Sequence, residues 1–238
     1  MSLELTPEIS TLSVLLIGFV FGLYHAVEAD HLAAVSAIVS ERKSLLSATI
    51  IGGFWGAGHT ISLFLVGVLV IFLKLQISES LEARLEAVVG AMLIILGLNA
   101  LRKIFQSEKI HAHTHTHEGH THTHIHTHTD ETAEKSHHFL RFTPRSVLVG
   151  MIHGLAGSAG LMLLVLPTIS STAVALIYIL IFGIGSIVGM MLMSLLLGLP
   201  FHFTAGRFLQ LNRAIRFCAG MFSFGLGVFI VYEKLLQK

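Results

Sequence analysis

Four side chains able to bind a transition metal lie within seven residues near the amino terminus. The stretch His25-Ala-Val-Glu28-Ala-Asp30-His31 stands inside a long apolar segment. Imidazole and carboxylate groups together suit divalent ions such as nickel, cobalt or zinc better than magnesium or calcium. A charged side chain at the centre of a membrane helix costs about 2.5–3.5 kcal/mol on insertion scales, so such residues are retained where they serve a function. The stretch is therefore the first candidate for a metal site within a membrane.

The spacing of these residues limits how a single helix can present them. His25, Glu28 and His31 follow one another at three-residue intervals and share one arc of a regular helix, whereas Asp30 points away from that arc. Two arrangements remain open. In one, Asp30 orients a ligand histidine or faces a neighbouring helix; in the other, the helix is interrupted and Asp30 caps a second half-helix.

Two further histidines stand in later apolar segments. His59 follows a run containing four glycines, Gly52-Gly-Phe-Trp-Gly-Ala-Gly58-His59-Thr60, and small residues let membrane helices pack closely. We predict His59 as an additional ligand; the alternative is a buried histidine bonded to a carbonyl. His153 is expected to hydrogen-bond Ser158 or a carbonyl, and is kept as a reserve ligand.

The composition indicates which elements must position these residues. Of the 238 residues, 53% are hydrophobic and only 12% are charged, which is too apolar for a soluble fold. A membrane-spanning helix needs about 20 apolar residues. We therefore predict an all-α integral membrane protein with about six transmembrane helices, at residues 11–39, 46–73, 85–105, 146–169, 171–199 and 211–233.

The chain divides into two three-helix parts, 1–106 and 142–238, joined by a His-rich loop at 107–141. Gly18 and Gly22 match Gly150 and Gly154 in order, and glycines recur similarly in the later helices. Because each part has an odd number of helices, the two parts are predicted to be inverted repeats, an arrangement that many transporters use to build a site at the membrane midplane.

The loop at 107–141 alternates histidine with threonine and has almost no aliphatic side chains. Such a segment buries too little apolar surface to offset its chain entropy, so we predict disorder without metal. Its imidazoles can chelate nickel, cobalt, copper or zinc with little selectivity. The functional interpretation is a metal store or sensor, and the alternative is a solvated linker.

Lysine and arginine residues are distributed unequally between the loops. Most of them flank the loop at 107–141 or follow the first and fifth predicted helices. By the positive-inside rule this places the His-rich loop in the cytoplasm and both termini outside. The protein is thus predicted to be a multi-pass protein of the plasma or inner membrane.

The motifs around the histidines resemble those of a known family. His25-Ala-Val-Glu-Ala-Asp30-His31 is similar to the His-x4-Asp-His signature of the nickel/cobalt transporter (NiCoT) superfamily, and Gly-x-Gly58-His59-Thr60 resembles its second signature. The resemblance implies that His25, Asp30, His31 and His59 bind nickel or cobalt during permeation. Glu28 occupies a signature position that varies toward aspartate. The second half lacks the acidic signatures of the importers and resembles the six-helix branches, which include urease-accessory-type and nickel/cobalt efflux proteins.

These observations predict transport of a divalent metal, nickel and/or cobalt, through a site formed by His25, Glu28, Asp30, His31 and His59. Efflux, and a metal sensor or urease-accessory protein without flux, are the alternatives. The expected partners are the metal ion as cargo, the lipid bilayer and proteins of nickel-enzyme maturation. No prosthetic cofactor and no nucleic acid are expected. The chain has no His-Glu-x-x-His pair, so no enzyme is predicted.

Overall fold

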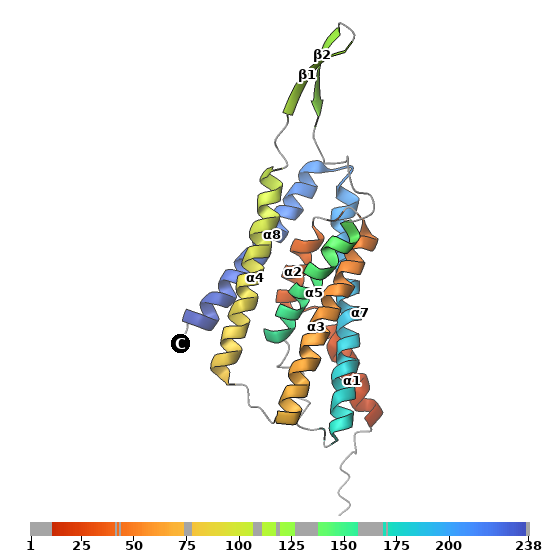
Figure 1. Cartoon of the computed structure of the whole chain (residues 1–238), viewed down its shortest axis with the longest axis vertical. Helices are drawn as coiled ribbons and strands as arrows, with labels where there is room; N and C mark the ends of the chain where they lie inside the picture. Colours follow the sequence, from red (N-terminus) through yellow and green to blue (C-terminus); the bar gives the residue numbers. More distant parts are fainter. Residues whose placement is uncertain are drawn as a thin grey trace, which may run out of the picture.

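The computed structural model describes residues 11–40, 42, 44–73, 78–106, 111–117, 120–126, 138–156, 169 and 171–236. Within these residues the chain forms a bundle of helices with a two-stranded hairpin projecting from one end (Figure 1). The elements, in chain order, are α1 Thr11–His25, α2 Ala29–Val39, α3 Leu45–Leu73, α4 Glu79–Gln106, β1 His111–His117, β2 His120–His126, α5 His138–Ala156, α7 Thr172–Thr204 and α8 Leu209–Leu236.

Four of the described helices, α3, α4, α7 and α8, are long and apolar enough to cross a membrane. The broken pair α1 and α2 makes a fifth candidate span. Helices suit this environment because they satisfy their backbone hydrogen bonds internally. The predicted span at 146–169 is described as a helix only as far as Ala156, and residues 157–168 lie outside the described residues. The chain is therefore a helical membrane protein, and six spans stay a prediction.

The first predicted span is not one continuous helix. It bends by 54° between α1 and α2, so the structure favours the interrupted arrangement over the unbroken one. The capping residue differs from the prediction. Glu28, with extended backbone (φ −61°, ψ 149°), is the N-cap of α2, and Asp30 lies in the first helical turn. Asp30 still satisfies an amide of that turn, because Oδ1 accepts a hydrogen bond from the backbone N–H of His31 at 2.8 Å.

Glycines set how closely the helices approach. Helix α1 packs against α7, α5 packs against α3, α3 also packs against α7, and α4 packs against α8. A Cβ atom on Gly22 would overlap the carbonyl oxygen of Phe182, and one on Gly154 would overlap the backbone of His59. At these two positions only glycine allows the backbones to approach this closely.

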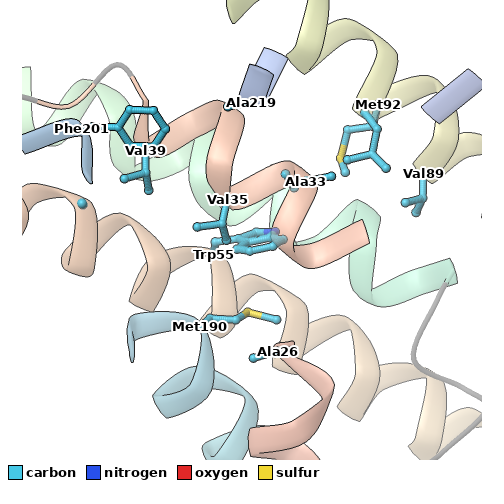
Figure 2. Packing of buried hydrophobic residues seen from close by; sticks show 13 residues of the cluster. Ala26, Ala33, Val35, Val39, Trp55, Val89, Met92, Met190, Phe201 and Ala219 are labelled. Carbon is cyan, nitrogen blue, oxygen red and sulfur yellow. The ribbon is translucent and has the colours of Figure 1, made fainter. Parts of the chain in front are cut away.

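The core surrounds α2 along most of its length. Trp55 of α3 is 1% exposed and lies close to Val35 of α2, with Met190 and Ala26 on its other side (Figure 2). The outward faces of the helices carry exposed leucine, isoleucine and phenylalanine side chains, as expected where lipid is the solvent. Helix α2 is thus enclosed, while its neighbours form the apolar exterior.

The His-rich segment differs from the prediction of disorder where the structure describes it. Strands β1 and β2 pair antiparallel, with His113 opposite His124 and His115 opposite His122. The physical reason lies in the same alternation that suggested disorder. Threonine is β-branched and favours strands, and a period of two matches the repeat of a strand.

Candidate metal centre

Three histidines from three helices meet at the break between α1 and α2. His25 is the last residue of α1, His31 lies in the first turns of α2, and His59 lies midway along α3. Their exposed fractions are 1%, 0% and 0%. One potential ligand atom of each residue lies within 4.8 Å of those of the other two. The break is what makes this possible, because it turns His31 back toward the end of α1.

The distances among these rings fit metal coordination. The Nε2 atoms of His25 and His59 lie 3.2 Å apart. Two nitrogens bound to one tetrahedral ion at about 2.0–2.1 Å each would stand about 3.3 Å apart. The ring centroids of His25 and His31 are separated by 4.4 Å, and those of His31 and His59 by 5.3 Å. Three imidazoles therefore surround one small volume.

Both carboxylates of the motif lie beside the Nδ1 atoms of the rings. Glu28 Oε1 lies 2.9 Å from His25 Nδ1, and Asp30 Oδ1 lies 3.0 Å from His31 Nδ1. A carboxylate that accepts a hydrogen bond from Nδ1–H fixes the ring tautomer and leaves the Nε2 lone pair for a metal. Asp30 is thus placed to orient His31, the first of the two roles that the sequence left open for it. Glu28 lies near His25 Nδ1 but makes no hydrogen bond with it.

His153 joins the cluster from the second half of the chain. Its ring on α5 is fully buried, and its Nε2 donates to Asp30 Oδ2 over 2.8 Å. The ring centroids of His153 and His31 lie 4.1 Å apart. Asp30, His31 and His153 form a second group whose potential ligand atoms lie within 4.8 Å of one another. The expected partner Ser158 lies outside the described residues, and the partner in the structure is Asp30.

Several ring nitrogens of the cluster are buried without a hydrogen-bond partner. They are His25 Nδ1, which lies near Glu28 without a hydrogen bond, His31 Nε2, His59 Nδ1 and His153 Nδ1. A buried polar atom left unsatisfied costs about 1–3 kcal/mol. Binding of a metal ion would remove that cost at His31 Nε2, which is the lone pair that the Asp30 contact leaves available. The unpartnered atoms therefore indicate a site built for a ligand.

A local signal for His153 was present in the sequence. Both halves contain Gly-x-x-His, as Gly22-Leu-Tyr-His25 and Gly150-Met-Ile-His153. A Cβ on Gly150 would overlap the carbonyl oxygen of Trp55, just as one on Gly22 would overlap that of Phe182. Gly150 therefore packs as Gly22 does. The glycine alignment used above pairs Gly22 with Gly154, which is four residues beyond Gly150, its counterpart in the packing. For this reason the alignment did not pair His153 with His25.

Comparisons with known proteins agree with the chemistry of the cluster. The family model NicO, described as high-affinity nickel-transport protein, matches residues 11–229. The urease accessory protein UreH of Bacillus sp. (strain TB-90) is 36% identical over 228 residues, which cover 95% of this chain and 93% of that protein. No solved structure matches.

A more distant relative comes from a plant. The chloroplast protein FOR GROWTH AND FERTILITY 2 of Arabidopsis thaliana is 24% identical over 219 residues. The match covers 91% of this chain and 55% of the plant protein, so the chain spans about half the length of that relative. The similarity nevertheless includes nearly all of the helical bundle described above.

Proposed function

Because the chain belongs to the NicO family of high-affinity nickel-transport proteins, we propose that it carries nickel across a membrane and binds the ion at His25, His31 and His59. The observation that carries this proposal is the meeting of three buried imidazoles at a break in a membrane helix, with a carboxylate behind two of them. Cobalt prefers similar ligands and is the second candidate ion.

The charges of the cluster suit a divalent ion within a membrane. Imidazoles supply the ligands, and two carboxyl groups, those of Glu28 and Asp30, lie beside them. A dehydrated divalent ion without such compensation would face a large desolvation cost. In the proposed function the ion therefore exchanges its hydration shell for imidazole nitrogens at a site with carboxyl groups beside it.

The proposed architecture is two inverted three-helix repeats around this site. Its support is the reciprocal packing of the halves: α1 packs on α7 as α5 packs on α3, and Gly90 meets Gly227 as Gly97 meets Gly220 between α4 and α8. With the His-rich segment in the cytoplasm, both termini lie outside. The clustered basic residues around that segment support this orientation.

Transport into vesicles of known orientation tests the proposed function. Radioactive nickel is supplied to membranes containing the wild type or the double variant His25→Ala, His31→Ala. We expect accumulation with the wild type and a rate at background with the double variant. His202→Ala, at the exposed end of α7, is the matched control and retains the wild-type rate. Accumulation in inverted vesicles alone would contradict uptake and establish efflux.

A second candidate function is nickel supply to urease assembly without flux. The similarity to UreH, a urease accessory protein, favours it. Reconstituted liposomes distinguish the two. Protein that binds nickel through His25 and His31 yet never moves it into the lumen would support the accessory function, whereas accumulation in the lumen would support the permease.

A further inference from the structure

A cavity of about 260 Å³ adjoins the metal centre between the start of α2 and the helices α4 and α8. Its apolar walls include Val89 and Leu226, and its charged lining consists of Glu28, Asp30, Glu86 and Lys234. These parts of α4 and α8 lie toward the end of the bundle opposite the hairpin (Figure 1). Three carboxylates therefore surround a space that adjoins the buried histidines.

Two of these carboxylates connect the cavity to the imidazoles. Glu28 and Asp30 line the cavity, and their side chains are 33% and 19% exposed. The same side chains contact His25 and His31, which are buried. An ion in the cavity would therefore contact carboxylate oxygens first. The imidazole nitrogens lie directly beyond these carboxylates.

The third carboxylate is held by an ammonium group. Lys234 Nζ lies 2.6 Å from Glu86 Oε2, with both side chains partly exposed. Glu82 and Glu233 also act electrostatically on Lys234. While the ion pair is intact, Lys234 neutralises Glu86 and places a positive charge beside the cavity, which opposes the approach of a divalent cation.

The cavity at the other end of α2 is lined by basic side chains. It has a volume of about 520 Å³ and is lined by Arg42, Lys103 and Arg145. The described residues that line this cavity include no carboxylate. Within the described residues, carboxylates line the cavity at one end of α2, and basic side chains line the cavity at its other end.

We propose that the acidic cavity is the port through which a divalent metal ion reaches the histidine cluster, and that the Glu86–Lys234 pair is its electrostatic gate. This proposal rests on the metal centre of the proposed function. In the port, the arriving ion displaces Lys234 and binds the Glu86 carboxylate. It then passes to Glu28 and Asp30 and finally to the imidazoles. The gate sets the rate of access and leaves the final coordination unchanged.

The rate of cobalt binding tests the port separately from transport. Co²⁺ is mixed with the purified full-length protein in a stopped-flow instrument, and its visible absorption is recorded. The same chain carrying His31→Ala and His59→Ala supplies the background from other histidines. The absorption component missing from that variant reports the metal centre. If the wild type shows no such component, the metal centre is wrong and the port with it.

Opposite charge changes at the gate should change the association rate in opposite directions. Lys234→Gln should raise it about threefold to tenfold, and Glu86→Gln should lower it by a similar factor, because charges near a cleft steer association. The final spectrum should be unchanged in both. Higher salt should reduce the differences, since screening weakens surface charges.

Two controls separate the charge effect from structural damage. The double variant Glu86→Gln, Lys234→Gln removes both charges and should return the rate to near the wild-type value. Lys103→Gln removes one positive charge at the basic cavity and should leave the rate unchanged. The port is overturned if both single variants bind at the wild-type rate, or if Lys103→Gln accelerates binding as much as Lys234→Gln does.

Discussion

Two groups of histidines in this chain differ in how the fold holds them. The buried group has His25, His31, His59 and His153 on four different helices, with carboxylates contacting three of the rings. The other group alternates with threonine in β1 and β2, which project beyond the bundle (Figure 1). The first group has its rings fixed before an ion arrives, whereas the second depends on two strands alone, and an isolated hairpin is only marginally stable.

Under the proposed function, we expect this difference to separate the selectivity of metal binding from the number of ions that the chain binds. Preorganised ligands bind more tightly because little ordering remains to be done when the ion arrives. Numerous imidazoles on a marginally stable hairpin bind several metals with little discrimination. We therefore expect transport to depend on the buried group, and the amount of metal retained to depend on the hairpin.

The largest effect is expected from removing one buried ligand. His59→Ala leaves two imidazoles of the three and should weaken nickel binding at the centre by at least about a hundredfold, because removal of an outer-shell partner alone costs about 10–100-fold. Nickel uptake should fall to background. Isothermal titration and radioactive uptake measure the two effects. Uptake at the wild-type rate would show that the ion travels elsewhere.

The next effect is expected at the carboxylate that links the two halves. Asp30→Asn keeps the shape but weakens the bonds to His31 and His153, which are 3.0 and 2.8 Å long. Nickel affinity should fall about 10–100-fold, as for other partners of metal-bound histidines. Measured binding isotherms give the value. An unchanged affinity would contradict an orienting role for Asp30.

A packing change should affect the buried group without altering a ligand. Gly154→Ala introduces a Cβ that would overlap the backbone of His59. We expect a loss of about 1–3 kcal/mol in stability, as for overpacked cores, together with weaker nickel binding. Thermal unfolding in detergent measures the first. Gly225→Ala, where a Cβ meets nothing within 4 Å, is the matched control, and an equal loss in both variants would rule out the steric explanation.

The smallest effect on transport is expected at the hairpin. Replacing the histidines of β1 and β2 with asparagine should change the initial rate of nickel uptake by less than about twofold, because the preorganised group is intact. The number of metal ions bound per chain at saturation should fall. Metal analysis after dialysis measures this number. Loss of uptake would show that the hairpin takes part in permeation itself.

Much of the candidate site could be predicted from local sequence. The spacing of His25, Glu28 and His31, and the cost of such residues within an apolar segment, pointed to a metal site without any structure. His59 could be added because small residues around it favour close helix packing. The helical membrane class followed from composition in the same way, since each span is a local property of about 20 residues.

The tertiary structure decided what local patterns leave open. The sequence offered an unbroken or an interrupted first span, and the packing of α2 against Trp55 and its neighbours accompanies the interrupted one. For the His-rich segment the prediction of disorder was wrong where β1 and β2 are described. Alternation of histidine and threonine is compatible with a strand as well as with disorder. In both cases local preference was too weak to determine the outcome.

The sequence by itself determined that this chain places imidazoles and carboxylates within a membrane at ligand spacing. Only the tertiary structure decided that His153 bonds Asp30, 123 residues away in the chain, and that Glu86 and Lys234 meet beside the same site. The physical reason is that helical periodicity determines which residues share a face of one helix. The partner of that face depends on how the glycines of separate helices allow their backbones to approach.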